Sequence, residues 1–108
     1  MTLFELFQNP HAHFAGLSIA ERVRAVCVAA LRGGQRIVAV QLPLDQYVRV
    51  EQYAVGYPQC FTWSRDDITW RTLGGELKVS MSPYVVGPCV FQVDDGETNV
   101  RIDLSVAG

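Results

Sequence analysis

The 108-residue sequence has no long apolar run and no concentration of basic residues. No stretch reaches the roughly 18 apolar residues of a membrane-spanning helix, so we expect no such segment. The opening MTLFELFQNP lacks a basic residue and carries an acid, which is not typical of a secretory signal. Nine basic and eleven acidic residues are scattered along the chain and give a net charge of −2. This distribution argues against a nucleic acid as the main partner.

Cysteine and histidine are also scarce. Cys27, Cys60 and Cys89 are odd in number and widely spaced, so we expect free thiols in a reducing cytoplasm. A Cys60–Cys89 bridge is the alternative. His11 and His13 are the only histidines. A metal site needs three or four ligands, and the sequence places no third ligand beside them. We therefore predict two loop histidines, no metal and no cofactor.

No arrangement typical of catalysis or nucleotide binding stands out. Asp66-Asp67 and Asp94-Asp95 are acidic pairs, but both lie where turns are expected and where Asp suits the backbone. Gly33-Gly34 and Gly74-Gly75 are not followed by the Lys-Ser/Thr of a phosphate-binding loop. We therefore name no catalytic residue and favour a protein that is not an enzyme.

The sequence does contain an amphipathic helix within residues 17–34. Ser18 and Glu21 have the spacing of a capping box, and Gly33-Gly34 supplies a C-terminal cap. Between these signals, apolar side chains recur with a period of 3.6 residues and form one stripe. The stripe consists of Ile19, Val23, Val26, Cys27, Ala30 and Leu31. Such a face must be covered by a sheet or by another helix.

Residues 1–16 form an N-terminal arm. Thr2 and Glu5 repeat the capping box and predict a short apolar helix, which Asn9-Pro10 ends because the residue before proline avoids the helical region. The arm either covers the core or docks on a partner or second subunit. In the second case Phe4 and Phe7 would make the contact.

After Gly33-Gly34 the pattern becomes strand, turn, strand. Three turns each predict residue pairs that share one apolar face. The pairs are Trp63–Ile68 and Phe61–Trp70 across residues 64–67, Trp70–Val79 and Ile68–Met81 across Gly74-Gly75, and Phe91–Val100 and Cys89–Ile102 across Asp95-Gly96. Residues 36–42 are a further strand. Residues 47–55 are favoured as a strand, with a short helix over residues 45–54 as the alternative.

These patterns predict one α+β domain over residues 1–108. The N-terminal amphipathic helix would pack on a curved antiparallel sheet of six or seven strands, mostly a meander. The sheet would occupy residues 35–108 after the arm (1–16) and the main helix (17–34).

Tyrosines outside the predicted core are the remaining functional signal. Tyrosine is enriched at protein interfaces, and several lie in the low-charge segments 53–58 and 83–88. We predict that the partner-binding residues are Tyr47, Tyr53, Tyr57, Tyr84, Val85, Phe4 and Phe7.

The favoured function is a non-enzymatic protein-binding module, such as a small inhibitor, an immunity or anti-defence protein, or a subunit of a larger assembly. One alternative is a small-ligand-binding or enzymatic domain, with a pocket between helix and sheet lined by Trp63 and Trp70. Another is a homodimer formed by pairing of sheet edges.

Overall fold

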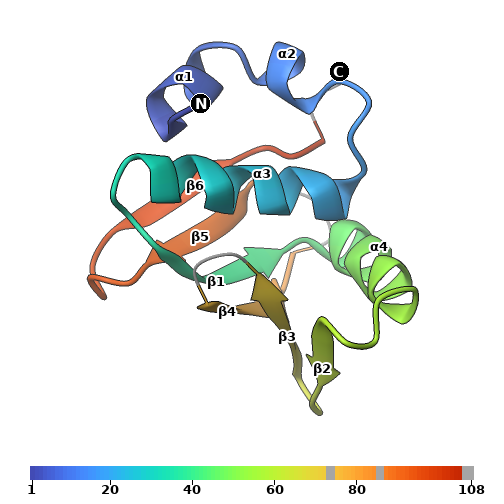
Figure 1. Cartoon of the computed structure of the whole chain (residues 1–108). Coiled ribbons are helices and arrows are strands. Elements are labelled where there is room, and N and C mark those ends of the chain that lie inside the picture. Colours follow the sequence, from blue (N-terminus) through green and yellow to red (C-terminus); the bar gives the residue numbers. More distant parts are fainter. Residues whose placement is uncertain (73–74, 85–86, 106–108) are drawn as a thin grey trace.

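The computed structural model describes residues 1–72, 75–84 and 87–105. In these ranges it has four helices and a six-stranded, mostly antiparallel sheet, which confirms the α+β class (Figure 1). No helix there is long and apolar enough to cross a membrane. The elements are α1 (Leu3–Gln8), α2 (Pro10–Phe14), α3 (Ile19–Arg32), β1 (Ile37–Leu42), α4 (Leu44–Val55), β2 (Phe61–Trp63), β3 (Asp67–Thr72), β4 (Gly75–Met81), β5 (Cys89–Val93) and β6 (Asn99–Ile102).

The main helix α3 begins and ends at its predicted signals. The N–H of Glu21 donates to Ser18 Oγ at 3.3 Å, and the N–H of Ser18 donates to the Glu21 carboxylate at 3.1 Å. At the other end, Gly33 N–H bonds the Ala30 carbonyl, and Gly34 has a φ of 79°, in the left-handed region that favours glycine. The capping box and the glycine cap are therefore both confirmed.

The N-terminal arm holds two short helices rather than one. The predicted α1 is present, with the Glu5 N–H donating to Thr2 Oγ1 at 3.4 Å. The second helix, α2, was not predicted. Pro10 occupies its first turn, where the missing N–H costs nothing, and Asn9 caps it by accepting from Ala12 N–H. The two histidines therefore lie on a helix, and their predicted place in a loop is wrong.

The prediction of a strand at residues 47–55 is also wrong, because α4 covers this segment, as in the alternative of a helix over residues 45–54. Its buried residues Gln46, Val50 and Ala54 recur every four positions, which is a helical period. Valine and tyrosine favour strands only weakly, and tertiary packing overrides that preference. The helix also interrupts the region 35–108 that was predicted as sheet.

The strand order in the sheet is β2-β3-β4-β1-β5-β6. β1 pairs with β4 in parallel, whereas all the other neighbours are antiparallel. The predicted meander therefore holds only within β2-β3-β4 and within β5-β6. A parallel pair needs a long crossover, and α4 with the first two strands of the meander supplies it.

The registers across two of the three turns are confirmed. Phe61 lies opposite Trp70 across the first turn, and Phe91 lies opposite Val100 across the last. The β3–β4 register differs from the prediction by two residues, since Trp70 lies opposite Leu77 and not opposite Val79. A shift of two keeps every side chain on its predicted face.

The shift moves the β3–β4 turn one residue earlier than predicted. Thr72 lies opposite Gly75, so Gly75 belongs to β4, while Gly74 is outside the described residues. Leu77 and Val79 are buried as predicted, whereas Met81, at the end of β4, is 48% exposed. Trp63 was also predicted to point inward, but it is 44% exposed on the short edge strand β2.

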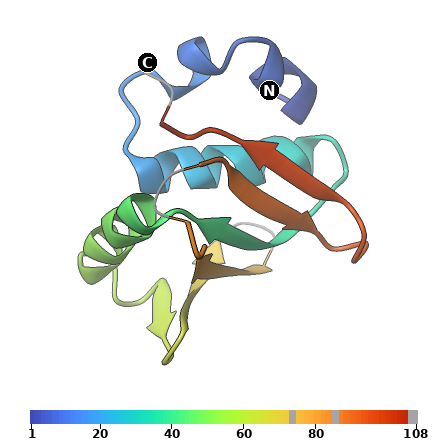
Figure 2. The same ribbon diagram turned by 180° about the vertical axis from the view of Figure 1, so that it is seen from behind.

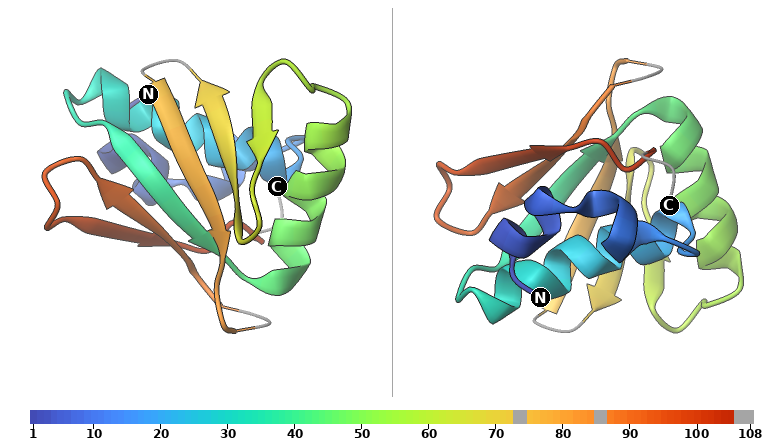
Figure 3. Two further views of the ribbon diagram at one scale, coloured as in Figure 1. Left: turned by 90° about the horizontal axis from the view of Figure 1, so that it is seen from below. Right: turned by 90° about the horizontal axis from the view of Figure 1, so that it is seen from above.

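One hydrophobic cluster joins the helices to the sheet. It includes Val23 and Val26 from α3, Val40 from β1, Phe91 from β5 and Phe14 from α2. Figure 1 shows α3 across the sheet, with α1 and α2 beyond it and α4 near β2. Figures 2 and 3 show the same arrangement from behind, below and above. The arm thus lies on the side of α3 away from the central strands.

Candidate functional site

The predicted partner-binding residues do not gather on one surface. Phe4 and Phe7 are 71% and 46% exposed on α1, at a different end of the molecule from α4 (Figure 1). Tyr47 is half-buried on α4. Tyr84 is 72% exposed, and its carbonyl accepts the N–H of Leu44, the first residue of α4. Val85 lies outside the described residues.

Tyr53 and Tyr57, in contrast, are brought together at the C-terminal end of α4. Their rings stack with centroids 4.6 Å apart. The Tyr53 ring also contacts Trp70, with ring centroids 6.0 Å apart. Trp70 in turn stacks on Phe61, with centroids 4.8 Å apart. Trp70 and Phe61 are buried, while Tyr57 is 44% exposed. Tyr57 is therefore the outer ring of an aromatic cluster anchored in the core.

The hydroxyls of Tyr47 and Tyr53 stay neutral near physiological pH. Burial raises the pKa of Tyr53, and the neighbouring Tyr57 raises it further. Burial also raises the pKa of Tyr47, with the carboxylates of Glu51 and of the β2–β3 turn adding to the effect. These residues therefore offer rings and neutral hydrogen-bonding groups rather than charge.

A surface hollow of about 330 Å³ lies beside the tyrosine stack. Arg24 of α3 and Arg71 of β3 line it together with Tyr53, Tyr57 and Trp70. The Arg71 guanidinium is held in place by a 2.8 Å hydrogen bond to the Gln59 carbonyl. The helices and the β2–β3 end of the sheet thus meet around one concave aromatic and basic surface.

A second hollow of about 370 Å³ continues from the first along α3, because Arg24 and Tyr53 line both. This second hollow is lined by further α3 side chains at helical spacing, and it extends to Met1. The added residues are Met1, Leu17, Glu21, Ala25, Val28 and Arg32. We call the two adjoining hollows the α3–α4 groove.

The α3–α4 groove is basic although the whole chain is acidic. Of the described residues that line it, Arg24, Arg32 and Arg71 are basic and Glu21 alone is acidic. The Glu21 carboxylate is occupied by the Ser18 N–H, and the hydrogen bonds with Ser18 lower its pKa. Within the described part of the chain, neither Arg24 nor Arg32 forms an ion pair. Their charge is therefore available to a partner.

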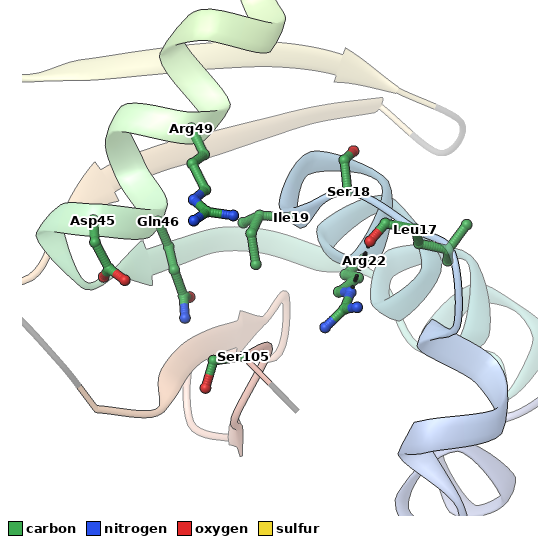
Figure 4. A pocket seen from close by; sticks show the side chains of 8 residues that line it. All are labelled: Leu17, Ser18, Ile19, Arg22, Asp45, Gln46, Arg49 and Ser105. Carbon is green, nitrogen blue, oxygen red and sulfur yellow. Dashed lines mark hydrogen bonds between the residues drawn. The ribbon is translucent and has the colours of Figure 1, made fainter. Parts of the chain in front are cut away.

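A third hollow, of about 280 Å³, lies between the N-terminal ends of α3 and α4 (Figure 4). Polar side chains dominate its lining, with Arg22 from α3 and with Gln46 and Arg49 from α4. No local pattern in the sequence predicts this pocket, since it depends on α4 being a helix. Arg22 and Arg49, which are 27 positions apart, meet there only through the tertiary fold.

Of the two tryptophans predicted to line a pocket between helix and sheet, only Trp70 lines one of the hollows described above. Trp70 lines the α3–α4 groove from a buried position, whereas Trp63 does not contribute to it. The part of the groove that Trp70 lines opens at the surface between α3, the C-terminal end of α4 and strands β2 and β3. The interior between α3 and the central strands is occupied by the core cluster.

The cysteines are free thiols, so the alternative Cys60–Cys89 bridge does not form. Cys27 and Cys89 are buried, and burial raises the pKa of each to about 12. Neither is therefore a ready nucleophile at neutral pH. Among the described residues, no cluster of three or more His, Cys, Asp or Glu side chains is placed to hold a metal ion.

Comparison of the chain with protein-family models, with curated proteins and with solved structures found no match. Its function must therefore be inferred from its own surfaces.

Proposed function

We propose that this chain is a non-enzymatic protein-binding module whose α3–α4 groove takes up an acidic segment of a partner protein. The observation that carries the proposal is the exposed Tyr57 ring, stacked on Tyr53 and lying beside arginines in one continuous groove. Tyrosine and arginine are the residue types that most often dominate binding energy at interfaces. A small inhibitor, an immunity or anti-defence protein, or a subunit of an assembly would use such a surface.

The chemistry of the groove favours an acidic occupant. Arginine can bind a carboxylate through two parallel N–H donors, which gives both energy and direction. Eight of the nine basic residues in the chain are arginine. Met1, Ala25 and Val28 add apolar surface between the charges. A segment that carries carboxylates around one apolar or aromatic side chain would match this pattern.

Rigidity of the tyrosine pair also supports the proposal. A tyrosine side chain has two rotatable bonds, so ordering it at an interface costs little conformational entropy. Tyr53 is held against Phe61 and Trp70 before any partner binds.

We also propose a cytoplasmic location, because free thiols suit a reducing compartment.

The test is retention of a partner from a lysate of the source organism by the immobilised protein. The double variant Arg24→Glu/Arg32→Glu should reduce retention of the identified partner by about tenfold or more, since it reverses the charge of the groove. Arg101→Glu is the matched control, because Arg101 is exposed on β6, at the opposite edge of the sheet from β2. The control should retain the partner like the unmodified protein.

Three results would overturn the proposal. Equal retention by the double variant and the control would show that the groove is not the contact surface. Loss of retention after nuclease treatment would identify a nucleic acid as the occupant. Capture of nothing except further copies of this chain would favour the homodimer.

A further inference from the structure

The pocket between the N-terminal ends of α3 and α4 contains an unusual buried side chain. Gln46, at 4% exposure, is the only buried polar or charged residue in the described part of the chain. Burying an amide costs free energy unless its donors and acceptor find partners. Its carbonyl oxygen has one, because the Cys89 thiol donates to Oε1 at 2.8 Å.

The other end of the Gln46 amide faces the pocket. Its Nε2 group donates to none of the described residues, yet none of their buried side-chain nitrogens or oxygens lacks a partner. The Nε2 group is therefore accessible from the surface, where Gln46 lines both this pocket and an adjoining hollow that shares Asp45 and Ser105 with it. Figure 4 shows the amide nitrogen directed toward Ser105. Cys89 sets this orientation, because a thiol that donates to Oε1 leaves the N–H groups on the opposite side.

Cationic groups surround the same space. Arg49, one turn after Gln46 on α4, extends its guanidinium into the pocket from above in Figure 4. Among the described residues it forms no ion pair. Arg22 lies on the opposite wall and donates to the Leu104 carbonyl at 2.8 Å, so its position is fixed. Ser105 lies at the rim, where its hydroxyl donates to the Asp103 carboxylate.

The N-terminal end of α4 reinforces this positive character. Both α3 and α4 begin at the pocket, and the N-terminal end of a helix carries a partial positive charge. Ser18 and the Glu21 carboxylate already cap α3, whereas no described side chain caps the first turn of α4. One acid, Asp45, also lines the pocket. Its carboxylate reduces the net charge, which suits an anion of low charge rather than a polyphosphate.

We propose that this pocket binds a small anion through a single carboxylate or phosphate group, with Arg49 and the Gln46 amide as its principal ligands. This site is separate from the α3–α4 groove and does not depend on a protein partner. The pocket's volume of about 280 Å³ leaves space for a ligand larger than the anionic group alone.

The experiment is a titration of the ¹⁵N-labelled protein with inorganic phosphate, and separately with acetate, at constant ionic strength. The side-chain NH₂ signals of Gln46 and the Nε signal of Arg49 should shift and saturate in the millimolar range. Arg49→Gln keeps a polar group of similar length and should weaken binding by about tenfold. Arg65→Gln, exposed in the β2–β3 turn, is the control and should change nothing.

A response to either anion supports the pocket, and the stronger one identifies the anionic group. Absence of saturation up to about 50 mM of both anions would overturn the proposal. An equal response in Arg49→Gln would do the same, because the anion would then be bound elsewhere or without selectivity. Arg49 is exposed, so its variant is expected to fold and to give an interpretable spectrum.

Discussion

At the scale of single residues, burial decides the chemistry of the cysteines. Cys89 is fully buried, and its thiol donates to Gln46, so it serves the core and orients an amide. Cys27 lies on the buried stripe of α3. Cys60 is half-buried at the start of β2 and lines the α3–α4 groove. The three thiols therefore differ in solvent access although none forms a disulfide.

This difference predicts the reactivity of the folded protein toward a thiol reagent. At pH 8 we expect one thiol per chain, that of Cys60, to react quickly with DTNB, because the thiolate is the reactive form and the other two are buried and protonated. In guanidinium chloride all three should react. The variant Cys60→Ser should abolish the fast phase, and two equal fast phases in the native protein would contradict this assignment.

The buried thiols also predict a loss of stability at alkaline pH. Their pKa is raised from 9.0 to about 12 in the folded state, so between these values only the unfolded chain releases the protons. Unfolding is therefore favoured increasingly as the pH rises through 9 toward 12, and only well below 9 do these groups leave stability unchanged. From pH 8.5 to 9.5 the free energy of unfolding should fall by roughly 1 to 1.5 kcal/mol.

Urea unfolding at each pH measures this change. The double variant Cys27→Ala/Cys89→Ala should be less stable at every pH, because it leaves cavities, but its stability should depend less on pH. An unchanged slope in the variant would assign the pH dependence to other groups.

At the scale of elements, signals local in sequence predicted structure well. The ends of α3 follow from Ser18, Glu21 and the glycine pair, and the β5–β6 hairpin follows from Asp95-Gly96. Asp95 Oδ1 accepts hydrogen bonds from the N–H groups of Glu97 and Thr98 in that turn. These bonds give Asp95 a structural role in the hairpin. Each of these features depends on neighbours within a few residues.

Features that depend on distant residues were missed. The parallel partner of Val40 is Val79, and no local pattern connects the two positions. The segment that became α4 is rich in Val and Tyr, and a helix forms there because one of its faces is buried with the core cluster. Helix and strand periods are difficult to separate in a segment this short.

The helical assignment of α4 makes an element-scale prediction with two matched valines. In a strand, Val48 and Val50 would share a face, whereas in α4 Val50 is fully buried and Val48 is 38% exposed. Val50→Lys should therefore lower the free energy of unfolding by at least about 3 kcal/mol, while Val48→Lys should change it by less than about 0.5 kcal/mol. Similar losses in both variants, measured by urea unfolding, would favour a strand.

At the scale of the whole molecule, one side chain ties distant parts together. Arg22 donates to the Leu17 carbonyl at 3.0 Å and to the Leu104 carbonyl at 2.8 Å, and its guanidinium lies over the Phe14 ring at 5.5 Å. It thereby links the arm, the main helix and the segment that follows β6. Such charged hydrogen bonds contribute more than neutral ones because the donor carries a full charge.

Removal of the Arg22 side chain should destabilise the segment that follows β6 in particular. Arg22→Ala should lower the free energy of unfolding by about 2 kcal/mol and increase hydrogen exchange in residues 103–105, with little effect on the β3–β4 pairing. Arg101→Ala, an exposed change on β6, should leave both quantities nearly unaltered. Uniform acceleration of hydrogen exchange across the sheet in Arg22→Ala would contradict a local stabilising role for Arg22.

The candidate groove shows what the sequence could and could not predict at this scale. The sequence predicts Tyr53 and Tyr57 as contact residues because they lie outside the predicted core, and the fold stacks their rings. It does not predict Arg24, Arg32 and Arg71, because they come from α3 and β3 and gather only after the helices meet the sheet edge. Charge scattered along a sequence can thus become concentrated on a surface.

Photo-crosslinking in a lysate of the source organism tests the central proposal most directly. A benzophenone amino acid would replace Tyr57 in the groove, Val48 on the outer face of α4, or Arg101 on β6. We expect one identified partner protein to crosslink at position 57, and about tenfold less at positions 48 and 101. Equal or stronger crosslinking at position 48 or 101, or no protein adduct at position 57, would contradict a protein-binding role for the α3–α4 groove.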